Sequence, residues 1–205
     1  MKGKGVGKKK DRRKQQFLIA LLLFAVMTGI LAGYVAYNEL SGGRNSVYTF
    51  TNVEGREKHD SLTLSLEKGE TWTDYSAYPE QPYGAQYDFS ISSDSRRQFQ
   101  GWMVEIVFSE PPVIDSSWNG EFKSGGNRIY YLPANNAAMD LTTIFPGTIR
   151  TFGAIIYTKN HTDVEEVIVT GHWYTPIFQQ RTFWILAAVW FILAFAAVQN
   201  LLLWR

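Results

Sequence analysis

Few residues in this sequence have the types and the spacing that enzyme chemistry requires. The three histidines, His59, His161 and His172, lie far apart, and none has the spacing of a metal ligand to another. Glu165 and Glu166 are adjacent, and neighbouring residues of a strand point to opposite faces, so these carboxylates cannot share a substrate. The sequence has no cysteine, which excludes disulfides and thiolate metal sites. We therefore predict a non-catalytic protein without a metal or another cofactor.

The remaining acidic residues and glycines also have simpler structural interpretations. Asp60, Asp74, Asp88 and Asp115 are predicted to lie in turns or at strand ends, where Asp is favoured for backbone reasons. The short glycine turns in "KSGG" and "SGGRN" lack the Gly-Lys-Ser/Thr ending of a phosphate-binding loop.

The chemistry that the sequence does offer is aromatic. Trp118 and Asn119 lie in "SSWNGEF", which is followed by a Gly-Gly turn and an aromatic strand. An indole ring in this setting either fills a β-sheet core or presents a flat surface to a ligand. Sugar rings present flat C–H faces, which pack on an aromatic ring through dispersion and apolar burial.

The segments that must position Trp118 alternate between apolar and polar residues, as half-buried strands do. One face of "QYDFSIS" carries Tyr87, Phe89 and Ile91, and one face of "GWMVEIVF" carries Trp102, Val104, Ile106 and Phe108. Further strands are predicted in "SVYTFTN", "SLTLSL", "NRIYYLP", "IRTFGAIIYT" and "DVEEVIVTGHWY". The predicted turns between them are "EKGE", "SSDSRR", "SEPPVIDSS", "KSGGN", "PANN" and "TKNHT". Short strands and polar turns indicate an antiparallel β-sandwich or barrel.

Four landmarks in order give this region a more specific resemblance. They are Gly101–Trp102 with Phe108, then Trp118–Asn119, Pro146–Gly147 and Phe152–Gly153, before the closing strand "VIVTGHW". With these landmarks, residues 61–173 resemble the family 2 carbohydrate-binding modules, bacterial modules best known for binding cellulose and xylan. The resemblance implies an all-β fold, an antiparallel β-sandwich of the immunoglobulin-like, Greek-key type.

The resemblance assigns different roles to the two tryptophans of these landmarks. It implies that Trp102 is a core residue and that Trp118, next to Asn119, is an exposed platform for a sugar ring. Where the family has another exposed tryptophan, this sequence has Met139 and Asp140 and no aromatic residue.

A third platform is expected before the strand that contains Gln86. The candidates there are Trp72, Tyr75, Tyr78 and Tyr83. The predicted carbohydrate-binding residues are Trp118, Asn119, Trp72 and Tyr83. Because the Met139 position lacks a ring, a soluble glucan, a xylan or a cell-wall glycan is a better expected ligand than a flat crystalline surface.

Two uncharged apolar runs of 21 residues each, Phe17–Tyr37 and Phe183–Leu203, flank this region. A helix of about 20 apolar residues crosses the hydrocarbon core, so both runs are long enough to span a membrane. Residues 1–14 contain eight basic residues and one acidic residue, which by the positive-inside rule places the N-terminus in the cytoplasm. The competing interpretation is a cleaved signal peptide, whose apolar region of about 7–15 residues is shorter than this run.

The predicted organisation has four parts. A basic cytoplasmic tail (1–16) precedes the first transmembrane helix (17–37), an extracytoplasmic β-sandwich (38–181) follows, and the second transmembrane helix (182–204) returns to the cytoplasm. This describes a two-pass protein of the bacterial plasma membrane with both termini in the cytoplasm. The basic run "KKKDRRK" directly precedes a span, so we interpret it as a topology signal that contacts the lipid bilayer, not as a nucleic-acid site.

Two functions remain open from the sequence. The first is a membrane-anchored extracytoplasmic module that binds polysaccharide at Trp118. The second is a non-catalytic sensory or structural membrane protein whose sandwich has lost sugar binding. Because the sequence ends at Arg205, just after the second span, this second role is expected to need another membrane protein as a partner. The second helix would contact it through Gln199, Asn200 and the small residues Ala194, Ala196 and Ala197.

Overall fold

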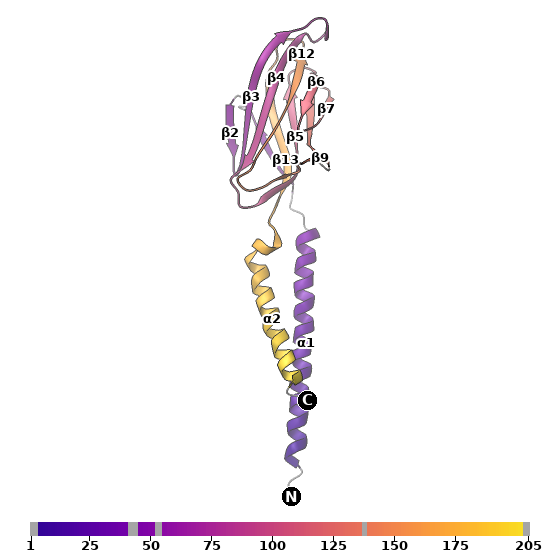
Figure 1. The fold of residues 1–205 in the computed structure, drawn as a ribbon, viewed down its shortest axis with the longest axis vertical. Coiled ribbons are helices and arrows are strands. Elements are labelled where there is room, and N and C mark those ends of the chain that lie inside the picture. Colours follow the sequence, from indigo (N-terminus) through magenta and orange to yellow (C-terminus); the bar gives the residue numbers. More distant parts are fainter. Residues whose placement is uncertain (1–3, 41–44, 52–54, 137–138, 203–205) are drawn as a thin grey trace. The chain divides into compact units, whose positions relative to one another are not determined.

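The computed structural model describes residues 4–40, 45–51, 55–136 and 139–202. The chain divides into two units, one with the strands (Gly43–Thr175) and one with the two long helices. The helices are α1 (Lys4–Leu40) and α2 (Arg181–Leu202), and the short 3-10 helix η1 (Ile177–Gln179) precedes α2 (Figure 1). Two segments, Lys14–Asn38 and Arg181–Leu202, are long and apolar enough to cross a membrane, with hydropathies of 2.4 and 2.2.

The strand unit is a β-sandwich of two antiparallel sheets (Figure 1). The first sheet has the order β1–β13–β5–β8–β7, with β11 also paired to β5, and the second has the order β2–β3–β4–β12–β6. Strands β9 and β10 form a separate two-stranded sheet. The strands are β1 (Asn45–Phe50), β2 (Gly55–His59), β3 (Leu62–Thr73), β4 (Tyr83–Ser93), β5 (Gln98–Phe108), β6 (Val113–Trp118), β7 (Gly120–Gly125), β8 (Arg128–Pro133), β9 (Asn135–Asn136), β10 (Met139–Asp140), β11 (Thr143–Ile144), β12 (Ile149–Thr158) and β13 (Val164–Tyr174). This confirms the predicted antiparallel sandwich flanked by two apolar helices.

The core between the sheets is rich in aromatic residues. Trp102 is 2% exposed and donates from its indole Nε1 to the carbonyl of Leu141 at 2.9 Å, so its predicted core position is confirmed. Its ring packs on Tyr131 and Phe152, whose own rings stack with centroids 4.0 Å apart. The predicted inward face of β4, with Tyr87, Phe89 and Ile91, is buried, as is that of β5. Alternation of period two therefore places the core correctly.

Several local predictions are wrong. The "EKGE" segment is not a turn, because β3 continues to Thr73 past a bulge between Lys68 and Thr71. The second half of "SEPPVIDSS" belongs to β6, and β2 and β7 were not predicted. A bulge lets a strand absorb an extra residue and continue pairing, so turn-forming residues there do not end it. Asp88 and Asp115, which were expected in turns or at strand ends, lie within β4 and β6.

The helical unit is held by contacts between α1 and α2. The indole of Trp190 donates to the Thr28 hydroxyl at 2.9 Å, and its ring lies 5.2 Å from that of Phe24. Ala194 and Ala197 line a cavity of about 230 Å³ together with side chains of α1. Asn200 donates to the carbonyl of Ala196 in its own helix at 2.8 Å. Two of the three small residues predicted to contact a partner chain, Ala194 and Ala197, therefore face α1 of the same chain.

Candidate functional site

Trp118 lies on the outer face of the second sheet, at the end of its edge strand β6. It is directly opposite Gly153 of β12, whose neighbours Phe152 and Ala154 point into the core. A Cβ at Gly153 would lie 2.5 Å from Cε2 of the indole and 2.5 Å from the carbonyl oxygen of Tyr87. The ring can therefore rest on the backbone of β12 only because residue 153 has no side chain. Trp118 is half-buried, with one side of its ring against the sheet.

Trp72 covers a second glycine on the same face. The bulge in β3 shifts the alternation, so that Trp72 pairs with Gly84 of β4 and points outward. A Cβ at Gly84 would lie 2.5 Å from the indole Nε1. That nitrogen donates to the hydroxyl of Tyr157 at 2.8 Å, and the two rings pack edge to face with centroids 6.0 Å apart. Tyr157 also pairs with Gly84, from the β12 side.

Tyr78 extends this aromatic group from the connection between β3 and β4. Its ring lies 4.2 Å from that of Tyr157, and its hydroxyl donates to Asp115 of β6 at 2.8 Å. This hydrogen bond raises the pKa of Tyr78 above its ordinary value. Asp74 fixes the connection, because its side chain accepts hydrogen bonds from the backbone and hydroxyl of Ser76. These hydrogen bonds lower the pKa of Asp74.

We call the outer surface of the second sheet, with Trp72, Tyr78 and Trp118, the aromatic face; Tyr157 is buried beneath Trp72 and Tyr78. Gly153 and Tyr157 are four residues apart on β12, which separates Trp118 from the other rings by about 13 Å along the strand. Polar groups lie between them, because β4 presents Gln86 and Asp88 on this face and the Gln86 amide donates to Asp88 at 2.6 Å. The face thus offers separated rings with hydrogen-bonding groups between them.

Two of the predicted site residues do not belong to the aromatic face. Tyr83 lies on the inward-facing side of the β4 alternation, and its ring contacts that of His161, with centroids 3.5 Å apart and the planes tilted by 31°. Asn119 has φ +62°, in the left-handed region that Asn tolerates better than most residues. Its amide donates to the carbonyl of Thr151 at 2.9 Å, and its own carbonyl accepts from the Tyr131 hydroxyl at 2.8 Å. Asn119 therefore positions the end of β6, and with it Trp118.

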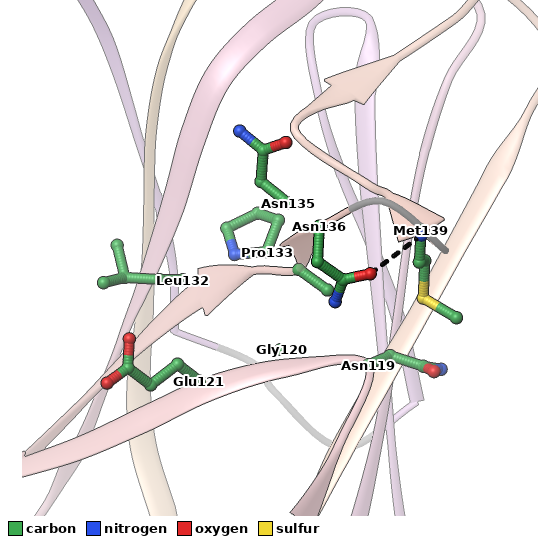
Figure 2. Close-up of a pocket in the computed structure, with 9 residues that line it drawn as sticks. Asn119, Gly120, Glu121, Leu132, Pro133, Asn135, Asn136 and Met139 are labelled. Carbon is green, nitrogen blue, oxygen red and sulfur yellow. Dashed lines mark hydrogen bonds between the residues drawn. The ribbon is translucent and has the colours of Figure 1, made fainter.

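A cavity of about 580 Å³ lies beyond Asn119, near β7, β8 and the β9–β10 hairpin (Figure 2). Its described lining includes Leu132, Pro133 and Met139 as apolar side chains and Glu121, Asn135 and Asn136 as polar ones. The Met139 amide donates to the Asn136 side chain at 3.0 Å (Figure 2). Among its described lining residues none has an aromatic ring, so this cavity offers a sugar no flat platform.

Sequence reasoning missed Tyr157, although the signal was present. Phe152, Ala154 and Ile156 are buried, so the alternating residues Gly153 and Tyr157 had to point outward. Trp72 points outward because of the bulge in β3, and the sequence indicates this bulge less clearly than it indicates the alternation in β12.

The described residues contain no group of three or more His, Asp or Glu side chains that could hold a metal ion. What the aromatic face can do chemically is pack apolar ring faces and exchange hydrogen bonds.

No model of a known protein family matches this sequence, and no curated protein matches it. Among solved structures, the chain is similar to the chitin-binding domain of a hyperthermophilic chitinase from Pyrococcus furiosus (19% identity, 57% of this chain and 95% of that one, TM-score 0.38). It is also similar to the chitin-binding domain of a Streptomyces coelicolor chitinase (17% identity, 52% and 90%, TM-score 0.37). A third is the internal xylan-binding domain of Cellulomonas fimi xylanase D (17% identity, 54% and 97%, TM-score 0.31). Likenesses at these TM-scores assign neither a family nor a ligand to this chain.

Proposed function

We propose that this protein is a non-catalytic, membrane-anchored module that binds a polysaccharide on its aromatic face. The observation that carries the proposal is the position of Trp118, whose ring rests on Gly153 at the surface of a rigid sheet. A half-buried ring held on backbone loses little conformational freedom on binding, so its outward surface is preorganised for a flat apolar partner. The C–H face of a pyranose ring is such a partner, and its hydroxyl groups need nearby hydrogen-bonding groups.

The other rings favour a polymer over a single sugar. Trp72 and Tyr78, which pack on the buried Tyr157, lie about 13 Å from Trp118 along β12, so one monosaccharide cannot contact both groups. An extended glycan chain lying along the strands would contact both, and would pass the Gln86 and Asp88 side chains between them.

The two apolar helices would anchor this module to a membrane. We propose that α1 and α2 cross the plasma membrane with both termini in the cytoplasm, since the basic residues of the chain's start directly precede the first span. The sandwich would then lie outside the cytoplasm, where glycans of the cell wall occur.

Affinity electrophoresis of the whole protein in a detergent without a sugar headgroup tests the proposal. Soluble β-glucans, xylans and glycol-chitin are cast separately in native gels, and the expected result is retardation by at least one of them. Trp118→Ala should remove that retardation, whereas Tyr130→Ala, an aromatic truncation on the other sheet, should not. Equal migration of the wild type and Trp118→Ala in every gel would favour the alternative, a structural or sensory protein without sugar binding.

A further inference from the structure

Two carboxylates lie in the same row of the second sheet as Trp118. Asp88 of β4 pairs with Gly153, the residue under the indole, and Glu67 of β3 pairs with Asp88. Neighbouring strands are about 4.8 Å apart, so the row runs from Trp118 across Gly153 to Asp88 and then to Glu67. The indole covers Gly153, so Asp88 is the next residue of this row beyond it.

This pair of carboxylates is unfavourable unless a cation lies nearby. Like charges directly opposite each other on an antiparallel pair destabilise it. On the described outward positions of β3, β4, β6 and β12 there is no Lys or Arg. Lys68 has the inward parity and is paired with Asp163, and on the edge strand β2 Lys58 is paired with Asp94 at 2.5 Å. On β2, Arg56 lies opposite Ser65, two residues from Glu67 along β3, and β3 separates it from Asp88.

The chemistry of a sugar stacked on Trp118 connects the platform with the carboxylates. The equatorial substituents of a stacked pyranose lie in the plane of its ring and extend past the edge of the indole, toward Asp88. A hydroxyl there can donate one hydrogen bond. An ammonium group can donate several hydrogen bonds and is attracted by both negative charges, whereas a sugar carboxylate is repelled by them.

We propose that the aromatic face selects a polysaccharide that carries free amino groups, an amino-sugar polymer that is not fully N-acetylated. Asp88 and Glu67 bind its ammonium groups while Trp118 holds the sugar ring. This inference rests on the proposed function, because the carboxylates act on a sugar that the aromatic face has already placed.

The test uses the whole protein in nanodiscs of phosphatidylcholine, which has no net charge, and calorimetric titration with three oligosaccharides. These are the glucosamine hexamer, the N-acetylglucosamine hexamer and a galacturonic acid hexamer, measured at pH 6 and at two salt concentrations. Exposed ion pairs contribute modestly, so each carboxylate should strengthen binding of the glucosamine hexamer by about two- to fivefold over the acetylated one. The preference should shrink at high salt, and the galacturonic acid hexamer should bind most weakly.

Substitutions separate this inference from the function on which it rests. Asp88→Asn and Glu67→Gln should each reduce the preference for the glucosamine hexamer over the acetylated one, and Glu165→Gln on the other sheet should leave that preference unchanged. Equal affinities for the two hexamers, or a preference that survives both substitutions together, would overturn the charge selection and leave sugar binding in place. Binding of the glucosamine hexamer that persists in Trp118→Ala would also overturn the charge selection, because it would show only a general attraction of amines to an acidic domain. No binding of any of the three hexamers would overturn this inference, and together with the absence of retardation in every polysaccharide gel it would overturn the proposed function itself.

Discussion

The contact between Trp118 and Gly153 predicts an unusual response to a single methyl group. In Gly153→Ala the new Cβ would lie 2.5 Å from Cε2 of the indole and 2.5 Å from the carbonyl oxygen of Tyr87. The indole can rotate away, whereas the carbonyl belongs to the paired backbone of β4. Overpacking of this kind costs about 1–3 kcal/mol, which for a domain of this size lowers Tm by about 4–12 °C. We also expect glycan retention to fall, because the displaced ring no longer lies flat.

A double-mutant cycle isolates the part of this cost that comes from the indole. Thermal unfolding, followed by near-ultraviolet circular dichroism of the core aromatics, is measured for the wild type, Gly153→Ala, Trp118→Ala and the double mutant. The overlap with the Tyr87 carbonyl remains in both backgrounds, but the overlap with the indole is absent once Trp118 is truncated. The methyl group should therefore cost about 1 kcal/mol less in the Trp118→Ala background. Equal costs in the two backgrounds would refute the packing of this ring on β12.

Three further changes test other parts of the structure. Tyr157→Phe removes the hydroxyl that accepts the hydrogen bond of the Trp72 indole, and should cost about 1 kcal/mol of stability in thermal unfolding. It should also weaken glycan retention. Retention equal to that of the wild type would count against a role of Trp72 and its neighbouring rings in binding. Trp102→Ala empties a core site, because Trp102 is 2% exposed, and should cost about 3–5 kcal/mol of stability or prevent folding. Failure to fold would be seen as loss of the cooperative thermal transition. A variant as stable as the wild type would contradict the core position of Trp102. Burial tends to raise the pKa of Glu110, but hydrogen bonds from Asn160, Thr162 and the Lys159 backbone outweigh it and lower that pKa. Its carboxylate should thus stabilise the fold above the pKa that Glu110 has in the unfolded chain, and this stabilisation should be lost as the pH falls through the pKa in the folded state. Glu110→Gln should therefore flatten the acid side of the profile of stability against pH, measured by urea unfolding at pH 3–7. An unchanged profile would refute this.

The sequence predicts the parts of this molecule that depend on alternation, and fails where pairing is irregular. Trp102 and the inward faces of β4 and β5 follow from period two, and the structure buries them as predicted. Trp72 and Tyr83 were equal candidates from the sequence, because they lie on two strands whose relative phase was unknown. The bulge between Lys68 and Thr71 sets that phase, and it places Trp72 outward while Tyr83 keeps the inward parity of β4.

The row of Trp118, Asp88 and Glu67 could not be predicted for a related reason. These residues are far apart in the sequence, and only the registers of three strand pairs bring them together. Asp88 was assigned to a turn or a strand end because Asp is common there, and its actual position in the middle of β4 gives it a different neighbourhood. Register is a tertiary property, set by packing across the whole sheet.

The most direct test of the central claim is a ¹⁹F spectrum of the whole protein labelled with 5-fluorotryptophan, in nanodiscs, during titration with the glycan that retards it most. The resonances of Trp118 and Trp102 are assigned with Trp118→Phe and Trp102→Phe. Sugar binding on the aromatic face predicts that the Trp118 resonance shifts along a saturable curve while the buried Trp102 resonance stays in place. A Trp118 resonance that does not move while the glycan binds, or with every glycan in the panel, would contradict the account.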